Sequence, residues 1–491
     1  MYLSAMIKRL ALPICIVLLV AMHLPFLQAD PDGLLAWGSR GAYTDEGLYT
    51  SQVRNYINHG QFDINETDGV AKAPFFSAYL LPFFALLGTH LWVARLAILL
   101  FFAITLYRFT YKHITQQYQP FAIGIIGLQY MVFTYSHFAM AEMLAASCII
   151  WILNYYLVYV KTGSNIAIAY ATLFGMAAVL VKTNHLYVMA ILPAVLGITS
   201  VRDALKNKAT IRKNATALGV SLAVNIIVST IIFLTVFLRN KALYIKIYYQ
   251  EVSGKFEPTF TQLIDRAGFN WNMITGDSVL AISIVLLVVA LIVFIVSRNT
   301  YFKAFSKYNY NLHAIYFCLV WLIVELHKLP VLNLPSRYLV ATFLAISMLT
   351  ILLFEQVVFT RLKQVGLILS MLIVVNGSVN TFQAFGRRNF VIKSMNDYVA
   401  AHSDNKRVML GTWAATACWQ SKNITMPVWE NYFNDHGFME KHHPQAIITE
   451  FDERDAGYIF TKRGVDLKAL SDSTHDFKIE EWQVRVSWLK N

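Results

Sequence analysis

Charged residues are scarce in this sequence. Of its 491 residues only 14% are charged, while 57% are hydrophobic, whereas a soluble globular protein carries about 25% charged and 45–50% apolar residues. This composition excludes an ordinary soluble domain. It also makes nucleic acid an unsuitable partner to explain the net charge of +12, because the excess basic residues lie mostly in loops between apolar segments, where they report membrane topology.

Cysteine is nearly absent as well. The four cysteines are Cys15, Cys148, Cys318 and Cys418, of which three lie inside apolar runs and one lies near the C-terminus. Their spacing forms neither a disulfide framework nor a CxxC metal site. We therefore expect neither disulfides nor a cysteine-bound metal to hold the fold together.

Long apolar runs are what the sequence has in quantity. Ala11–Leu27, Val279–Val296 and Leu339–Leu353 are long enough as helices to cross or nearly cross a hydrocarbon core of about 30 Å. The sequence therefore predicts an α-helical polytopic membrane protein with about eleven spans. The expected spans are 10–27, 86–106, 120–136, 139–160, 165–182, 184–200, 216–238, 278–297, 312–329, 338–357 and 365–383.

The loops between these spans differ in charge from one side to the other. With the N-terminus in the cytoplasm, one side collects Arg108, Lys112, Lys161, Arg202, Lys206, Lys208, Arg212, Lys213, Arg298, Lys303, Lys307, Arg361 and Lys363. The other side collects Asp30, Asp32, Asp45, Glu46, Asp63, Glu66, Asp68, Glu251, Glu257, Asp265 and Asp277. Basic loops mark the cytoplasmic side. We therefore expect a multi-pass protein of the inner (plasma) membrane whose C-terminal segment lies outside, in the periplasm.

Two outer loops are long, 28–82 and 239–277. The first contains an apolar, proline-interrupted stretch at 73–84 that suits a helix lying along the membrane surface. The second is aromatic around Tyr244–Phe256, which fits either a lid over a lipid or a segment packed on the C-terminal domain.

The last hundred residues differ from the rest, because basic and acidic residues balance there. We divide the chain into a transmembrane domain, 1–383, and an extracytoplasmic α/β domain, 384–491. Residues 396–402 are expected to be helical, and strands are expected at 407–411, 457–461 and 482–488.

Ionisable residues at membrane depth or at the mouth of the bundle are costly and usually functional. The sequence places several at the outer side: Asp45, Glu46, Lys72, Arg95, Glu142, Lys182 and Arg337. Each also has an ordinary explanation: a helix cap for Asp45–Glu46, a structural ion pair for Arg95–Glu142, and headgroup anchoring for the others. Their gathering at one face favours a substrate that is anionic and anchored in lipid.

The ordered set of these residues resembles the membrane-embedded GT-C glycosyltransferases. The nearest branch comprises the dolichyl-phosphate-mannose-protein mannosyltransferases and the lipid A aminoarabinose transferase. The segments that carry the resemblance are Asp45-Glu46, Lys72-Ala-Pro74, Leu80–Gly88, Trp92-Val-Ala-Arg95, Glu142, Leu180-Val-Lys182 and Arg337-Tyr338-Leu-Val. It covers the membrane domain and is strongest over 40–190.

The resemblance implies transfer of a sugar from a polyprenyl-phosphate donor to a lipid, glycan or protein acceptor at the outer face, with inversion at the anomeric carbon. Asp45 would then be the general base, and Glu46 and Glu142 would complete the acidic set of the catalytic site. The donor phosphate would be held by Lys72, Arg95, Lys182, Arg337 and Tyr338.

No metal site or other cofactor is expected from the sequence. The acid that precedes the lysine in the aminoarabinose transferase is Ala71 here, and no Cys/His set replaces it. His442-His443 is taken as surface. A divalent metal is compatible with the family but has no ligand set. Two other functions stay open: a transporter of polyprenyl-linked lipids, and a non-catalytic relative that binds the lipid.

Overall fold

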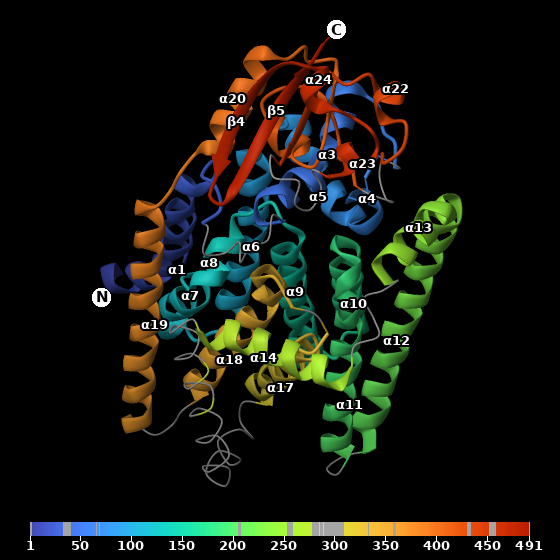
Figure 1. Ribbon diagram of the computed structural model, residues 1–491. Coiled ribbons are helices and arrows are strands. Elements are labelled where there is room, and N and C mark those ends of the chain that lie inside the picture. The colour runs from blue at the N-terminus through green and yellow to red at the C-terminus, as the bar shows by residue number, and fades with distance from the viewer. Residues whose placement is uncertain are drawn as a thin grey trace.

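The computed structural model shows a helical bundle with a small sheet domain at one end (Figure 1). It describes residues 2–32, 41–64, 66–67, 69–204, 208–252, 259–276, 284, 288, 309–331, 333–356, 360–429, 434–450 and 458–490. Most of the expected eighth span, 278–297, therefore lies outside the described residues, as do Lys255 and Phe256 of the second outer loop.

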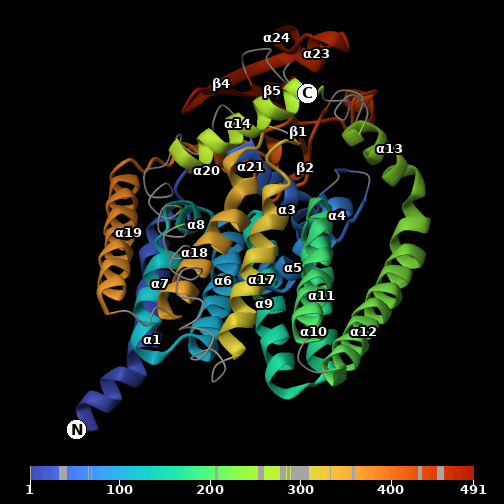
Figure 2. The same ribbon diagram turned by 90° about the horizontal axis from the view of Figure 1, so that it is seen from below.

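The bundle is built from apolar helices that follow the hydrophobic runs. They are α1 (Tyr2–His23), α6 (Leu91–His113), α7 (Gln119–Gly127), α8 (Tyr130–Ser136), α9 (Ala141–Thr162), α10 (Asn165–Val181), α11 (Ile191–Ala204), α12 (Lys208–Ile232), α17 (Asn309–Leu326), α18 (Val340–Gln356) and α19 (Thr360–Gly386). Helix α9 lies at the centre, where most of its residues are buried. Helices α12 and α19 stand at opposite edges of the bundle (Figures 1 and 2).

Five helical stretches of the described chain are long and apolar enough to cross a membrane: Leu91–His113, Ala141–Thr162, Thr183–Val201, Ile211–Tyr248 and Ser336–Glu355. Four shorter ones, Leu10–Phe26, Pro74–Leu87, Asn165–Val181 and Leu312–Leu326, are also apolar. By length and composition these helices match those expected of a polytopic membrane protein, while the count of about eleven spans stays a prediction.

The two expected outer loops contain helices. The first holds α3 (Gly41–His59), α4 (Gly69–Lys72) and α5 (Pro74–Leu87), which starts at a proline and continues past Pro82. A proline at the start of a helix leaves no hydrogen bond unmade. The second loop holds α13 (Lys241–Val252), which continues from α12, and α14 (Phe260–Gly276). Helices α3, α4 and α5 lie between the sheet domain and the bundle (Figure 1).

The sheet domain follows α19 and begins with α20 (Val391–His402). Its five strands run in the order β2-β1-β3-β5-β4, and the short helices α21 (Ala414–Ala417), α22 (Phe438–His442), α23 (Tyr458–Lys462) and α24 (Leu467–Leu470) connect them. The strands are β1 (Val408–Leu410), β2 (Ile424–Met426), β3 (Ala446–Glu450), β4 (Ser471–Ile479) and β5 (Trp482–Leu489). Pairs β1–β2 and β1–β3 are parallel, and β3–β5 and β4–β5 are antiparallel.

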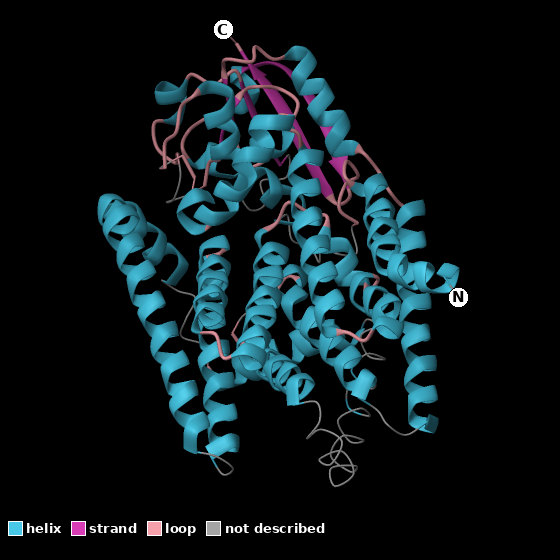
Figure 3. Ribbon diagram, turned by 180° about the vertical axis from the view of Figure 1, so that it is seen from behind, coloured by secondary structure: helices cyan, strands magenta, loops and turns pink. Residues whose placement is uncertain are grey.

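Every residue of β3 is buried, as expected of a strand covered on both faces. Figure 3 shows the sheet at one end of the molecule, surrounded by helices.

One expected strand is wrong. Residues 458–462 form helix α23, and Ile459 and Phe460 are both buried in one apolar cluster with Leu410 and Ile447. Neighbouring residues of a strand point to opposite faces. A helical turn instead lets both side chains reach the same cluster, so packing overrode the β-rich composition of this segment. The helix expected at 396–402 and the strands expected near 407–411 and 482–488 are confirmed as α20, β1 and β5.

The sheet domain and the membrane domain share a core. Ala42 and Tyr43, at the start of α3, pack in the same cluster as Met395, Trp413 and Ile448 of the sheet domain. The rings of Tyr43 and Trp413 stack with their centroids 6.4 Å apart. The helix that carries Asp45 and Glu46 is therefore held by the C-terminal domain.

Candidate active site

Four charged side chains meet where α3, α9, α10 and α18 come together. Arg337 Nη2 lies 3.2 Å from Asp45 Oδ2, and Lys182 Nζ lies 2.6 Å from Glu142 Oε1. Arg337 Nε lies 3.8 Å from the same oxygen of Glu142, which joins the two ion pairs into one network. The four side chains are between 3% and 14% exposed. Their charges therefore interact where water screens them poorly. We call these residues the four-residue network.

Each member of the four-residue network stands near a helix end. Asp45 lies near the start of α3. Glu142 lies in the first turn of α9, where the helix dipole favours an acid. Lys182 follows α10 in an extended conformation, and Arg337 belongs to the short 3₁₀ helix Ser336–Leu339 that leads into α18. Segments far apart in the sequence thus bring the predicted residues together.

Two tyrosines enclose the ammonium group of Lys182. Its Nζ lies 4.5 Å from the ring centre of Tyr338 and 5.3 Å from that of Tyr49. It also donates to the Tyr338 hydroxyl at 3.4 Å. Cation–π contacts of this length favour a positive charge over the ring faces. Tyr338, expected to bind phosphate, therefore lies against Lys182, and it also lies against Arg337, with its ring centre 5.2 Å from the guanidinium carbon.

A glycine makes room for Arg337. A Cβ atom at Gly41 would lie 2.7 Å from Nη2 and 2.8 Å from Nη1 of Arg337, which is closer than real side chains approach each other. The absence of a side chain at the start of α3 thus lets the guanidinium lie against the helix that carries Asp45. Sequence reasoning missed this residue, because nothing local distinguishes Gly41 from any other helix-starting glycine.

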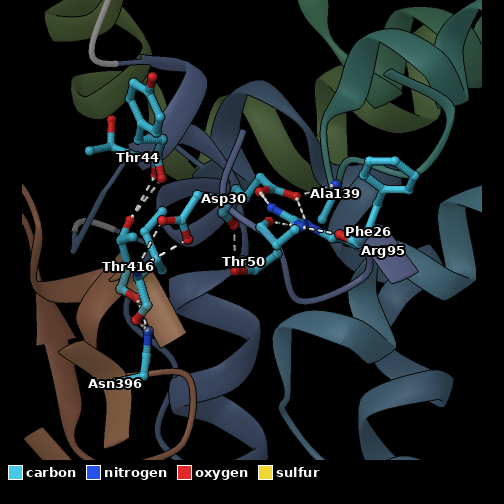
Figure 4. Close-up of polar contacts among 12 residues, drawn as sticks. Phe26, Asp30, Thr44, Thr50, Arg95, Ala139, Asn396 and Thr416 are labelled. Carbon is cyan, nitrogen blue, oxygen red and sulfur yellow. Dashed lines mark hydrogen bonds and ion pairs between the residues drawn. The ribbon is translucent and has the colours of Figure 1, made fainter. Parts of the chain in front are cut away.

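Glu46 and Arg95 form a separate, closed ion pair (Figure 4). Arg95 Nε donates to Glu46 Oε1 at 2.9 Å, and Nη2 donates to Oε2 at 2.6 Å. Arg95 Nη1 donates to the carbonyls of Phe26 and Ala29, at 2.8 and 2.6 Å. The backbone N–H of Ala139 donates to Glu46 Oε1 at 2.6 Å. The pair therefore ties α3 to α6, to the end of α1 and to the segment before α9.

This arrangement favours a structural role for the pair. Arg95 is 0% exposed and Glu46 is 3% exposed. Each of the three nitrogens of the guanidinium is occupied by protein acceptors, so a phosphate would have to displace them. The structural ion pair considered for Arg95 exists, but its partner is Glu46 and not Glu142. The donor-phosphate role of Arg95 and the catalytic role of Glu46, both implied by the resemblance, stay predictions, and the geometry does not favour them.

Lys72 is half-buried at the end of α4. The hydroxyl of Tyr244 in α13 donates to the carbonyl of the neighbouring Ala71 at 3.2 Å. Ala71 also packs in one cluster with Leu243 and Ile247 of α13, and with Trp429 of the C-terminal domain at its edge. The second outer loop therefore contacts both α4 and the C-terminal domain. This is the packing that one of the two expectations for it described, and its role as a lid stays a prediction.

A second buried ion pair beside the network was missed by the sequence analysis. Lys328 Nζ lies 2.5 Å from Glu325 Oε2, and the Glu325 side chain is 0% exposed. Both residues fall in the expected span 312–329, so the signal was present as two charges in an apolar run. Lys328 also donates to the carbonyl of Tyr338 at 3.4 Å, which places it next to the four-residue network.

The C-terminal domain docks on α3 through a buried arginine. Arg54 donates to the carbonyls of Gly47, Ala415 and Cys418, and its guanidinium carbon lies 3.9 Å from the ring centre of Trp419. Burial lowers the pKa of Arg54 to about 9. On the same face of α3, Thr416 donates to the carbonyl of Tyr43 at 3.3 Å (Figure 4). These contacts attach the C-terminal domain to α3.

The described part of the chain contains no group of three or more His, Cys, Asp or Glu side chains that could hold a metal ion. His442 contacts the amide oxygen of Asn434 at 3.2 Å, and His443 is exposed. The acids of the four-residue network are each paired with a base, so they do not form a ligand set. The structure therefore offers, among the residues it describes, none to which a metal can be assigned.

A cavity of about 370 Å³ lies beside the Glu46–Arg95 pair rather than at the four-residue network. Phe138 lines it, and the ring of Phe138 lies 5.0 Å from the Arg95 guanidinium carbon. The ion pair of Arg387 with Asp32, 2.9 Å long, borders the same cavity. None of the four network residues lines it. The candidate site therefore rests on side-chain chemistry and not on the shape of this cavity.

Comparison with known proteins gives matches in structure alone. No family model matches the sequence, and no curated protein matches it. The chain is similar to the crystal structure of ArnT from Cupriavidus metallidurans in the apo state, with a TM-score of 0.61 and 14% identity, covering 96% of this chain and 97% of that one. The same protein bound to undecaprenyl phosphate matches with a TM-score of 0.59, again at 14% identity over 96% and 97% of the two chains.

A third match is the crystal structure of the Archaeoglobus fulgidus oligosaccharyltransferase in complex with Zn and sulfate. Its TM-score is 0.56 and its identity 12%, over 92% of this chain and 69% of that one. Identities this low speak to the fold. The likeness spans the bundle and the C-terminal domain together, since it covers nearly the whole chain. The expectation drawn from the ordered motifs is confirmed: this chain has the GT-C fold of membrane glycosyltransferases.

Proposed function

We propose that this protein is an inverting glycosyltransferase that moves a sugar from a polyprenyl-phosphate donor to a lipid, glycan or protein acceptor. The observation that carries the proposal is the four-residue network of Asp45, Glu142, Lys182 and Arg337, in which two acids and two bases meet at helix ends beneath the C-terminal domain. The GT-C fold supports it. So does the undecaprenyl phosphate that the related ArnT structure binds.

In this proposal Asp45 is the general base. It takes the proton of the acceptor hydroxyl while the hydroxyl oxygen attacks C1 of the sugar. Its ion pair with Arg337 holds the carboxylate in place near the start of α3. A base placed in this way typically contributes about 10²–10⁴ in rate.

The cations act on the leaving group. As the bond from C1 to the phosphate oxygen breaks, the electron pair stays on that oxygen and polyprenyl phosphate gains a negative charge. Lys182 and Arg337 stabilise this charge, which is an electrostatic task in a poorly screened site. Lys72 and Tyr338 complete the phosphate site in the proposal. Glu142 orients both cations, because it contacts Lys182 at 2.6 Å and Arg337 at 3.8 Å.

The Glu46–Arg95 pair has a positioning role in the proposal. It fixes the orientation of α3 against α6 and the end of α1. Neighbouring residues of a helix point about 100° apart, so locking Glu46 also fixes the direction in which Asp45 points. Near-attack geometry is sensitive to shifts of about 1 Å.

The proposal includes a location and an orientation. The protein is placed in the inner membrane with its N-terminus in the cytoplasm and residues 384–491 outside. The distribution of basic loops supports this orientation. Protease added to either side of sealed vesicles tests it, since cleavage in 384–491 is expected from the outer side alone.

The experiment that tests the function follows the leaving group, because the acceptor is unidentified. Purified full-length protein is incubated with undecaprenyl-phosphate sugars of several kinds and a membrane lipid extract, and release of undecaprenyl phosphate is measured. Release by the unaltered chain, lost in Asp45→Asn, supports the proposal. The anomeric configuration of the product, read by NMR, tests inversion.

Two results contradict the proposal. Tight binding of the donors without release of undecaprenyl phosphate assigns the chain to non-catalytic lipid-binding relatives. Movement of intact donor across the membrane of reconstituted vesicles, again without release, assigns it to transporters.

A further inference from the structure

Lys328 stands between the Glu325 carboxylate and two tyrosines, Tyr187 and Tyr338, next to the four-residue network. Its Nζ lies 4.4 Å from the ring centre of Tyr187, 2.5 Å from Glu325 Oε2 and 3.4 Å from the carbonyl oxygen of Tyr338. The ammonium of Lys182 in turn lies over the ring of Tyr338. The two lysines thus lie on either side of one residue, although they are distant in sequence.

The position of Lys328 is fixed by the residues around Glu325. Glu325 accepts from Trp321 Nε1 at 3.3 Å and from Thr342 Oγ1 at 3.5 Å, in addition to Lys328. Glu325 is fully buried, whereas the Lys328 side chain is 14% exposed. The carboxylate therefore anchors the ammonium of a side chain that is itself not completely buried.

Lys328 keeps a donor to spare. An ammonium group has three N–H donors, and the acceptors of Lys328 in the described part of the chain are Glu325 and the Tyr338 carbonyl. Its other contact among the described residues is the ring face of Tyr187, so one N–H has no oxygen acceptor there.

Neighbouring buried polar atoms are also unsatisfied. Among the described residues Glu142 Oε2, Arg337 Nε and His185 Nδ1 are buried without a hydrogen-bond partner. His185 lies three residues after Lys182, to whose carbonyl its backbone N–H donates at 2.9 Å. A buried polar group without a partner is costly, and such groups in native proteins call for an explanation such as a bound ligand. Of the three, Arg337 Nε is a donor and therefore calls for an acceptor, whereas Glu142 Oε2 is itself an acceptor.

We propose that Lys328 is a further phosphate-binding residue, which together with Lys182 and Arg337 holds the phosphate of the polyprenyl-phosphate lipid, and that Glu325 positions it. This inference rests on the proposed function, because it names the group that the same site binds. Phosphate oxygens are acceptors only, so they satisfy the spare donor of Lys328 and the Nε of Arg337 at once. A neutral ligand would have no comparable electrostatic attraction to the three cations Lys182, Lys328 and Arg337.

The test measures binding of undecaprenyl phosphate to purified full-length protein in detergent. Lys328→Met is expected to raise the dissociation constant at least about tenfold, as loss of a charge-assisted hydrogen bond does. Lys328→Arg, which keeps the charge, is expected to recover most of the affinity. The matched control is Lys393→Met, which breaks the exposed 2.7 Å pair with Asp397 on the C-terminal domain and is expected to bind as the unaltered chain does.

A fold control is needed, because Lys328→Met leaves Glu325 buried without its partner. The double variant Glu325→Gln/Lys328→Met removes both charges and is expected to bind as weakly as Lys328→Met while unfolding at nearly the temperature of the unaltered chain. Binding of undecaprenol, which lacks the phosphate, is expected to be equal in all variants. Inorganic phosphate is expected to compete with undecaprenyl phosphate in the unaltered chain and less in the double variant.

The outcomes separate the inference from the proposed function. If the unaltered chain binds undecaprenyl phosphate and the double variant binds it within twofold, Lys328 is structural and the inference is wrong while the function stands. If the unaltered chain does not distinguish undecaprenyl phosphate from undecaprenol, the proposed function fails and the inference fails with it.

Discussion

Replacing Glu46 with glutamine tests whether two neighbouring acids have different tasks. Glu46 Oε1 accepts from both Arg95 Nε and the Ala139 N–H, and Oε2 accepts from Arg95 Nη2. A glutamine has one oxygen and one NH₂ group. If its oxygen takes the Oε1 position, its NH₂ faces the Nη2 donor, and if it is flipped, its NH₂ faces two donors. Neither orientation satisfies the site.

The size of the effect follows from this geometry. Arg95 is fully buried, and the substitution removes the carboxylate that accepts two of its hydrogen bonds. Breaking a buried ion pair by removing one partner costs about 3–5 kcal/mol. The same acid-to-amide change at Asp397, whose pair with Lys393 is 41–47% exposed, is expected to cost less than about 1 kcal/mol. Asp397→Asn is therefore the matched control.

The assay is reversible unfolding of the purified protein in mixed micelles, run beside the turnover assay. Glu46→Gln is expected to lower the free energy of unfolding. The double variant Glu46→Gln/Arg95→Met is expected to lower it by less than the two single variants do in sum, because each single variant already removes the same ion pair. If Glu46→Gln unfolds like the unaltered chain and loses turnover, Glu46 belongs to the chemistry and the structural assignment is refuted.

Four further expectations follow from the structure. Asp45→Asn is expected to lower turnover at least about a hundredfold, and near-normal turnover would remove Asp45 from the mechanism. Gly41→Val is expected to impair donor binding, because its side chain displaces the Arg337 guanidinium; unchanged affinity for undecaprenyl phosphate contradicts this. Burial raises the pKa of Glu66 to about 7 from its ordinary 4.5, so the folded state holds this proton more tightly than the unfolded state. The free energy of unfolding is then expected to fall by up to about 3 kcal/mol as pH rises from 4.5 to 7, and to be constant above pH 7. Glu66→Gln is expected to flatten this pH dependence. If the variant keeps the pH profile of the unaltered chain, Glu66 is not the group responsible. Lys246 is exposed on α13, and protease cleavage after it is expected to slow when undecaprenyl phosphate binds under the second outer loop; equal cleavage with and without the lipid rejects the lid.

The sequence alone determined the class of the protein and the residues of greatest interest. Hydropathy is a local property, so apolar runs predict helices wherever they occur, and the described helices follow those runs. A charge in such a run is costly in any fold, which is why Arg95, Glu142 and Lys182 stand out in the sequence without knowledge of their partners. The same reasoning applies to Glu325 and Lys328, which also lie in an apolar run, but the sequence analysis did not single them out. Local composition was least informative in the C-terminal domain, where a segment that resembled a strand became α23.

The tertiary structure alone decided which charged side chains form ion pairs with each other. The sequence suggested Glu142 as the partner of Arg95. In the structure α3 lies against α6, so that Glu46 pairs with Arg95. Glu142 pairs with Lys182 and Arg337 instead. Asp45 and Glu46 looked like one carboxylate pair, yet on a helix they point in different directions, one into the network and one into a closed ion pair. Such pairings depend on where helix ends far apart in the sequence come to rest, and on a C-terminal domain that holds α3 in place. No periodicity in the chain encodes those distances, because they arise from the packing of the whole fold.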